Sequence, residues 1–213
     1  MKPNSLLSAS LAAVVLLMAG CASTGYDKAG HTSSTIEKTA RSIHKGNGQI
    51  DSVLLALSSL VNSPEADLKA QFEKFNASVS KLEKLSDDVN AQSVAMQTQG
   101  TAYFRSWNEE LAKIHNEDIR SRSTDRKNAV AARFEKVRIS YARTKADFLP
   151  FMSDLKDIRT ALSTDLTAGG IASIKSVANK ADNNSGPLRT SLTNLEQDFK
   201  DLGVSLSATT PAE

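Results

Sequence analysis

The only cysteine of the chain, Cys21, is the residue whose surroundings point to specific chemistry. It follows a short positive start that contains Lys2, an uncharged run over residues 6–18 and two small residues. A charged start, an apolar run and a small-residue cleavage site together make a secretory signal peptide. The run is too short to cross a bilayer, which takes roughly 20 residues. We therefore expect residues 1–20 to be a signal peptide that is removed.

The four residues that end in this cysteine, Met18, Ala19, Gly20 and Cys21, resemble a bacterial lipobox. The resemblance implies a diacylglyceryl group on the Cys21 sulfur, cleavage before this residue and acylation of the new amino terminus. Several acyl chains attach a protein stably to a membrane, whereas a single chain does so only marginally. The cysteine count agrees, because an unpaired cysteine in an exported protein requires a reason. The alternative is an ordinary signal peptide with an incidental cysteine.

The residues after the cleavage point bear on where the protein is located. Ala22 and Ser23 follow the cysteine, and resemblance to enterobacterial sorting then favours the outer membrane, facing the periplasm. Residues 21–30 are mostly small and polar, which predicts a flexible tether between the lipid and the folded domain. Apart from the covalent lipid on Cys21, the sequence predicts no cofactor.

The three histidines, His31, His44 and His115, lack the spacing of metal ligands. None belongs to an HExxH motif, and the chain has no second cysteine to complete a zinc site. His115 has Asp118 one turn further on, an arrangement common on solvated helix faces. The chain also has no nucleophile elbow and no glycine-rich phosphate loop. We therefore expect no catalytic residue, no metal site and no enzymatic activity.

A basic stretch is the strongest charge feature of a chain whose formal net charge is only +2. Between Arg120 and Lys145 there are nine basic residues against two acidic ones. Five of them are candidates for contact with an anionic surface, such as phospholipid or lipopolysaccharide phosphates or an acidic protein: Arg120, Arg122, Arg126, Lys127 and Arg133. The alternative is a solvated helix face, balanced by the acidic residues just before it. The near-neutral charge and the export signal disfavour nucleic acid as a partner.

Two aromatic residues, Tyr103 and Trp107, lie four positions apart and therefore share one face of a helix. Tyrosine and tryptophan are frequent anchors in protein interfaces, which makes this pair a candidate partner-binding patch. The alternative is ordinary packing of both rings in the core of a helical bundle.

Long helices must position these residues, because apolar residues recur with alternating steps of three and four along most of the chain. The sequence shows no alternating strand pattern. It therefore predicts an all-α fold, an elongated antiparallel coiled-coil-like helical bundle of three to four long helices over residues 31–206. Residues 207–213 are expected to form a disordered tail.

Helix-breaking residues predict the ends of the first helices. We expect the second helix to run from Pro64 to near Arg120, with a bend or break at Gly100. Its connection to the third helix is expected near residues 121–124, at the start of the basic stretch. Pro150 should kink the third helix, because it removes one backbone donor and crowds the preceding turn.

The C-terminal part of the chain contains further breaking residues. Gly169 and Gly170 are expected to end the third helix. A short helix over residues 171–181 and a turn at residues 183–187 should then precede a last helix over residues 188–206.

The central and C-terminal two-thirds of the chain resemble the bacterial family named domain of unknown function 2959. The residues that carry the resemblance are helical positions at fixed spacings: Phe104, Trp107, Glu110, Leu111, Ile114, Asn116, Ile119, Arg120, Ser123, Tyr141, residues 148–151, Asp154 and residues 170–174. The resemblance implies an exported, all-helical, coiled-coil-rich protein and brings no known activity.

The sequence thus predicts a non-enzymatic lipoprotein of the cell envelope that acts as a helical scaffold or protein-interaction module in the periplasm. Its expected partners are the membrane, through the lipid anchor, and an envelope protein. The alternative function is binding of an anionic lipid or glycan surface by residues 120–145. Seams this regular often continue between chains, so a homo-oligomer is a further alternative.

Overall fold

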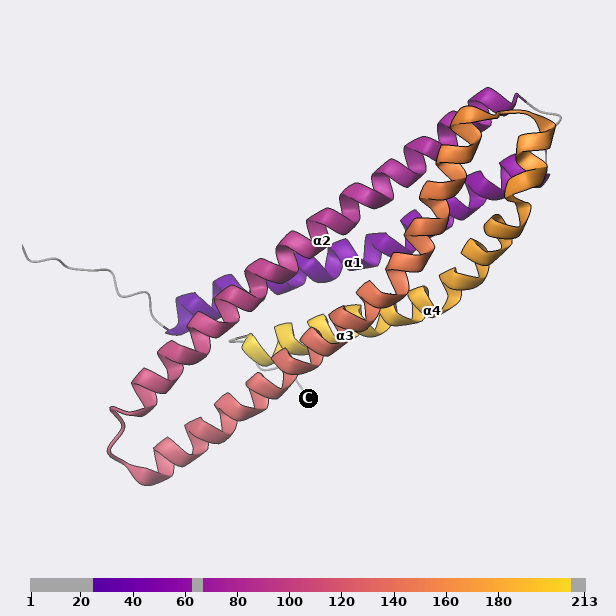
Figure 1. Ribbon diagram of the computed structural model, residues 1–213. Helices are drawn as coiled ribbons and strands as arrows, with labels where there is room; N and C mark the ends of the chain where they lie inside the picture. The colour runs from indigo at the N-terminus through magenta and orange to yellow at the C-terminus, as the bar shows by residue number, and fades with distance from the viewer. Residues whose placement is uncertain (1–24, 63–66, 208–213) are drawn as a thin grey trace, which may run out of the picture.

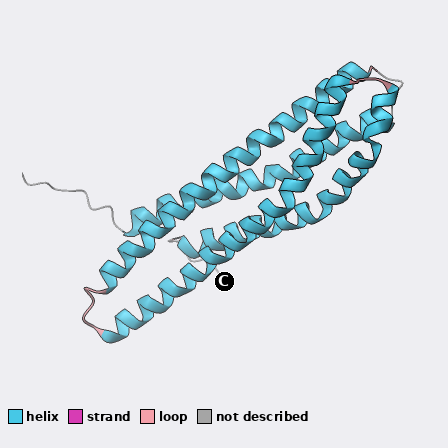
Figure 2. Cartoon of the chain, in the orientation of Figure 1, coloured by secondary structure: helices cyan, strands magenta, loops and turns pink. Residues whose placement is uncertain are grey.

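The computed structural model describes residues 25–62 and 67–207, and these form a four-helix bundle (Figures 1 and 2). The helices are α1 (Gly25–Asn62), α2 (Leu68–Leu111), α3 (Glu117–Thr164) and α4 (Ala168–Leu206). Each packs against two others, since α1 and α3 both contact α2 and α4. At about 1.5 Å per residue, α3 alone is about 70 Å long. The prediction of an all-α, elongated antiparallel bundle is confirmed, with four helices and, in the described residues, no strand.

The apolar stripes of the four helices meet in two core clusters. One cluster lies toward the end where α1 joins α2, and it contains the completely buried rings of Phe75 and Phe151. The other lies toward the opposite end and contains Phe199, which is also completely buried. Leu192 of α4 packs against both clusters. The periodic seam of the sequence is therefore filled within a single chain.

Three side chains cap the helices and thereby set the connections. The carboxylate of Asp67 accepts from Ala70 N at 3.1 Å, Asn116 Oδ1 accepts from Ile119 N at 3.0 Å, and Thr167 Oγ1 accepts from Gly170 N at 3.2 Å. Such caps satisfy backbone donors that the first turn of a helix leaves unpaired. The second connection consequently lies at residues 112–116. The prediction of a connection at residues 121–124 is wrong, because those residues lie inside the first turns of α3.

The turn predicted within the last part of the chain is absent from the described helices. α4 runs without interruption through residues 183–187, so the predicted turn there is wrong. Ser185 and Leu188 are buried on the inner face, and this packing outweighs the weak helix propensity of Gly186 and Pro187.

Gly100 and Gly170 allow close packing and do not mark helix ends. α2 continues through Gly100, where a Cβ would stand 2.3 Å from Cε1 of Phe134. The glycine thus lets a ring of α3 approach the backbone of α2. Gly169 and Gly170, expected to end the third helix, instead lie in the first turn of α4. α3 ends earlier, at Thr164, and bends along its second half, which contains Pro150 (Figure 1).

The start of the bundle differs from the prediction as well. α1 begins at Gly25, so residues 25–30 are helical and the predicted tether over residues 21–30 is too long. The second helix begins at Leu68, not at Pro64. The predicted signal peptide, Cys21 and residues 208–213 of the predicted tail lie outside the described residues.

One end of the bundle gathers the start of α1, the end of α4 and the connection between α2 and α3 (Figure 1). Here α2 and α3 project past the other two helices, and we call residues 108–124 the hairpin tip. The projection begins where the Arg126 guanidinium donates to the carbonyl of Ser205, in the last turn of α4. The opposite end holds the end of α1, the start of α2 and the connection from α3 to α4 (Figure 1).

Candidate functional site

A cavity of about 540 Å³ opens in the side of the bundle and is lined by residues of all four helices. The side chains of Ile43 and Ile50 from α1 and Leu195 from α4 are buried and form its floor. Apolar side chains of α2 and α3 form its walls: Leu82, Leu85, Val89, Phe148 and Met152. We call this cavity the groove. Its volume lies within the range of roughly 300–1,000 Å³ that is usual for small-molecule sites.

The groove exists because small or polar residues occupy seam positions in the middle of the bundle. Gly46 of α1, Ser86 of α2 and Thr144 of α3 line it, where larger apolar residues would close the space. The packing between α2 and α3 is also the sparsest of the four helix interfaces. The groove therefore lies where the two core clusters meet, and its lining includes residues from each.

Several polar groups around the groove are paired with other groups of the protein. The Tyr141 hydroxyl donates to Asn90 Oδ1 at 2.7 Å and thereby bridges α3 to α2. Burial raises the pKa of this hydroxyl above its ordinary value. Thr144 Oγ1 lies 2.9 Å from the carbonyl oxygen of Ser140 and 3.1 Å from that of Ser191. These groups hold the walls of the groove in place and leave the apolar lining as its main chemical character.

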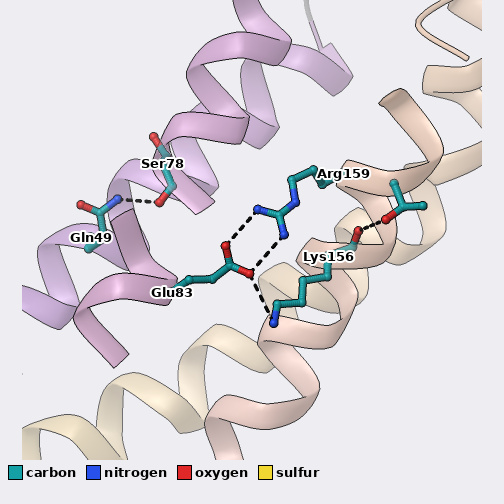
Figure 3. Close-up of polar contacts among 6 residues, drawn as sticks. Gln49, Ser78, Glu83, Lys156 and Arg159 are labelled. Carbon is teal, nitrogen blue, oxygen red and sulfur yellow. Dashed lines mark hydrogen bonds and ion pairs between the residues drawn. The ribbon is translucent and has the colours of Figure 1, made fainter. Parts of the chain in front are cut away.

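A charged cluster joins α2 to α3 and includes Lys156, which also lines the groove (Figure 3). Glu83 of α2 accepts from Arg159 of α3 at 3.0 and 3.1 Å, and Lys156 Nζ lies 3.3 Å from the same carboxylate. The hydrogen bonds from Arg159 hold the pKa of Glu83 below its ordinary value, despite some burial. On the neighbouring interface, Gln49 Nε2 donates to the carbonyl of Ser78 at 2.9 Å. The first contact joins α2 to α3 and the second joins α1 to α2.

Exposed residues form the mouth of the groove. Leu149 of α3 lines the groove and is 58% exposed. Lys145 of α3 and Asp87 of α2 are exposed here too, and neither has an ion-pair partner within the described part of the chain. Lys156 is a second cation at the mouth, but it is paired with Glu83.

The five basic residues predicted to meet an anionic surface all have partners within the protein. Arg120 and Arg122 pair with Glu117 and Asp118 at 3.7 and 3.2 Å. The other three are bound to neighbouring helices: Arg126 to the Ser205 carbonyl, Lys127 to Asn108 Oδ1 at 2.7 Å, and Arg133 to the Asp201 carbonyl at 2.9 Å. Arg120 and Arg122 lie on the hairpin tip, whereas Arg126 and Arg133 tie α3 to α4.

The predicted partner-binding pair, Tyr103 and Trp107, packs inside the bundle. Both rings are half-buried against the second core cluster, with centroids 5.4 Å apart in an edge-to-face arrangement. Trp107 Nε1 lies 3.2 Å from Ser123 Oγ on α3. Burial raises the pKa of Tyr103 above its ordinary value. These contacts favour the packing alternative for the pair.

The other candidate residues are dispersed. His115 is exposed in the connection between α2 and α3, and His44 lies 3.3 Å from Glu196 on the surface. Over residues 25–62 and 67–207 there is no group of His, Cys, Asp and Glu side chains that could hold a metal ion. No helix in that part of the chain contains an apolar stretch of the length that crosses a bilayer.

The family model described as protein of unknown function (DUF2959) matches residues 19–201. The chain belongs to this family. No curated protein and no solved structure matches it. The match covers the whole groove of this DUF2959 protein, including residues of α1 for which the sequence alone carried no clear resemblance.

The groove is the part of this DUF2959 protein that sequence reasoning missed. A partial signal was present, because Ser86 occupies a seam position between apolar neighbours. That signal does not say which small residues face one another, since this depends on the register between helices that are distant in sequence. Gly46 and Ser86 line one cavity only because α1 and α2 pack antiparallel at this register.

Proposed function

We propose that the protein is a non-enzymatic lipoprotein of the bacterial envelope, made with a signal peptide over residues 1–20. In this proposal a covalent lipid on Cys21 holds it at the outer membrane, facing the periplasm. The four-helix rod acts as a scaffold or interaction module for an envelope protein.

The observation that carries the proposal is the position of Gly25. Helix α1 begins only four residues after Cys21, at the end of the bundle from which α2 and α3 project (Figure 1). A lipid on Cys21 would therefore hold that end close to the bilayer. The far end of α3 would stand about 70 Å away, well clear of the headgroups.

Metabolic labelling with an alkyne fatty acid tests the anchor. We expect the wild-type chain to be labelled and to sediment with membranes, and Cys21→Ser to lose both properties. Density-gradient separation of inner and outer membranes then tests the location. An unlabelled wild-type chain would contradict the lipoprotein proposal.

Site-specific photo-crosslinking in cells tests the scaffold. Exposed apolar positions on three different helices, Leu55, Val94 and Ile139, provide sites for the crosslinker. We expect one face to yield a reproducible adduct with an envelope protein, identified by mass spectrometry. Absence of adducts from all three positions would count against an interaction role.

A second candidate function is binding of an anionic lipid or glycan surface by the basic region 120–145, whose first residues belong to the hairpin tip. It is favoured by the location of Arg120 and Arg122 at the end next to Gly25. Their partners Glu117 and Asp118 weaken the case, because they neutralise the tip locally.

Liposome sedimentation at low salt separates this second function from the first. If it holds, the double variant Arg120→Gln/Arg122→Gln should lose binding to anionic vesicles. The double variant Lys69→Gln/Lys74→Gln removes the same charge at the opposite end of α2 and serves as the control. Equal binding by both variants would exclude the tip as the contact.

A further inference from the structure

We propose that the groove binds an acyl chain that carries an anionic head group, with the chain on the apolar floor and the head group at the mouth beside Lys145. The inference goes beyond the proposed scaffold function and does not depend on a lipid at Cys21. It rests on the shape, lining and charge of the groove.

The shape of the groove suits a linear ligand. Along α3 its lining extends from Tyr141 to Lys156, which corresponds to about 22 Å of helix. Along α2 it extends from Leu82 to Asn90. The long direction follows the helices, because the space lies between two nearly parallel walls. A flexible hydrocarbon chain fits such a space better than a compact, rigid molecule does.

The lining favours hydrocarbon over a polar ligand. Leucine, isoleucine, valine, phenylalanine and methionine side chains dominate it. Of the uncharged polar groups that face the space, Thr144, Tyr141 and Asn90 already hydrogen-bond within the protein. The short hydroxyl side chains of Ser86 and Ser153 are the others in the lining. A polar ligand would gain few new partners here, whereas an acyl chain would lose contact with water over most of its length.

The charges at the mouth favour an anionic head group. Lys145 has no ion-pair partner in the described residues, and Lys156 lies on the same face of the rim. Asp87 also lines the mouth and opposes an anion. Together with the neighbouring ion pairs of Glu83, the three cations Lys145, Lys156 and Arg159 outnumber the two carboxylates Asp87 and Glu83 by one positive charge. A carboxylate or phosphate next to Lys145 would complete a pair that the protein itself leaves open.

The first test measures fatty-acid binding by a variant in which a larger side chain occupies part of the groove. The full chain, with Cys21→Ser in every variant so that no covalent lipid is present, is titrated with palmitate against a fluorescent fatty-acid probe. Ser86→Leu places a larger side chain in the groove, whereas Ser80→Leu makes the same change on an exposed position of α2. We expect Ser86→Leu to weaken palmitate binding about tenfold or more and Ser80→Leu to leave it unchanged.

The second test changes the mouth, where substitutions do not disturb the core. Ser153→Trp is expected to obstruct the groove from an exposed position. Lys145→Gln should weaken binding of palmitate several-fold but not binding of its methyl ester, since the ester carries no charge. Lys84→Gln, on an exposed position outside the lining, should affect neither ligand.

Two arms identify the source of the acyl chain. Groove-dependent binding of palmitate alone would assign a free fatty acid, and groove-dependent binding of lysophosphatidylglycerol would assign a phospholipid chain. Either result supports the proposal. The proposal would be overturned if both ligands bound equally well to three variants, Ser86→Leu, Ser153→Trp and Ser80→Leu. It would also be overturned if the chain with Cys21→Ser alone bound neither ligand. Both outcomes leave the lipoprotein proposal untouched, because every variant lacks Cys21.

Discussion

Gly169 and Gly170 are neighbours in the first turn of α4, but an added Cβ would meet different surroundings at each. At Gly170 it would stand 2.0 Å from the carbonyl oxygen of Asp165, a backbone atom that cannot move aside easily. At Gly169 its nearest contact would be Thr167 Oγ1 at 3.5 Å, an ordinary van der Waals distance. The turn between α3 and α4 thus favours glycine at the second of the two positions.

We therefore predict that Gly170→Ala lowers the free energy of unfolding by about 1–3 kcal/mol through this clash. Gly169→Ala should raise it by up to about 1 kcal/mol, because alanine favours the helix. Urea unfolding followed by circular dichroism measures both. Equal effects of the two substitutions would show that Asp165 moves freely.

Glu83 gives the bundle a pH dependence that its surroundings explain. Its folded-state pKa lies below its ordinary value of 4.5, because Arg159 donates two hydrogen bonds to it. The resulting stabilisation is complete above that value and is lost as the pH falls through the folded-state pKa. We predict that Glu83→Gln lowers the free energy of unfolding by about 1 kcal/mol at about pH 7, and by less at about pH 3.

Urea unfolding at these two pH values measures the effect of Glu83→Gln, and the same experiment on Glu135→Gln is the control. Glu135 also accepts from an arginine, Arg138, but both lie on the exposed surface of one helix. This pair joins no two helices, so its loss should change the unfolding midpoint less than the loss of Glu83. A pH-independent effect of Glu83→Gln would mean that the contact with Arg159 is not ionic.

At the scale of the element, α4 shows how packing overrides local propensity. Pro187 lies in its interior on the exposed face and cannot donate a backbone hydrogen bond. We predict that Pro187→Ala restores this bond and raises the free energy of unfolding by about 1–3 kcal/mol. Thermal unfolding measures the change. A lower melting temperature would indicate that the shape imposed by Pro187 is needed for packing against α1 and α3.

The helices could be predicted from the sequence to different degrees. The seams of α1 and α3 were visible because apolar residues recur at helical spacing for many turns. The boundary between α2 and α3 was misplaced, although Asn116 followed by Glu117 and Asp118 is a recognisable helix start. The continuity of α4 through Gly186 and Pro187 could not be predicted, since it depends on burial of Ser185 and Leu188 against other helices.

The surroundings of the candidate site residues could be predicted less well than the helices. The sequence identified Arg126 and Trp107 as surface candidates by type and spacing, but each has a partner on another helix. Sequence position alone cannot reveal such contacts. The groove escaped prediction for the same reason, because it is formed by a register between four helices.

For the molecule as a whole, the two core clusters imply two cooperative units. They meet at the groove, where Leu192 is shared between them. We predict that Phe151→Ala and Phe199→Ala each lower the free energy of unfolding by about 3–5 kcal/mol, because both rings are completely buried. Native-state amide exchange should accelerate mainly in the half that contains the substitution. Uniform acceleration along the rod in both variants would show a single unit.

The two ends of α4 lie at opposite ends of the bundle, so the distance between them can be measured with a pair of dyes. Ser207 and the connection between α2 and α3 lie at one end, and the turn at residues 165–167 lies at the other. Because α4 joins these ends with 39 residues and is curved, a dye pair at residues 166 and 207 would span at most about 60 Å (Figure 1). Energy transfer between such dyes reports directly on whether the curvature of α4 changes when something binds along the side of the bundle.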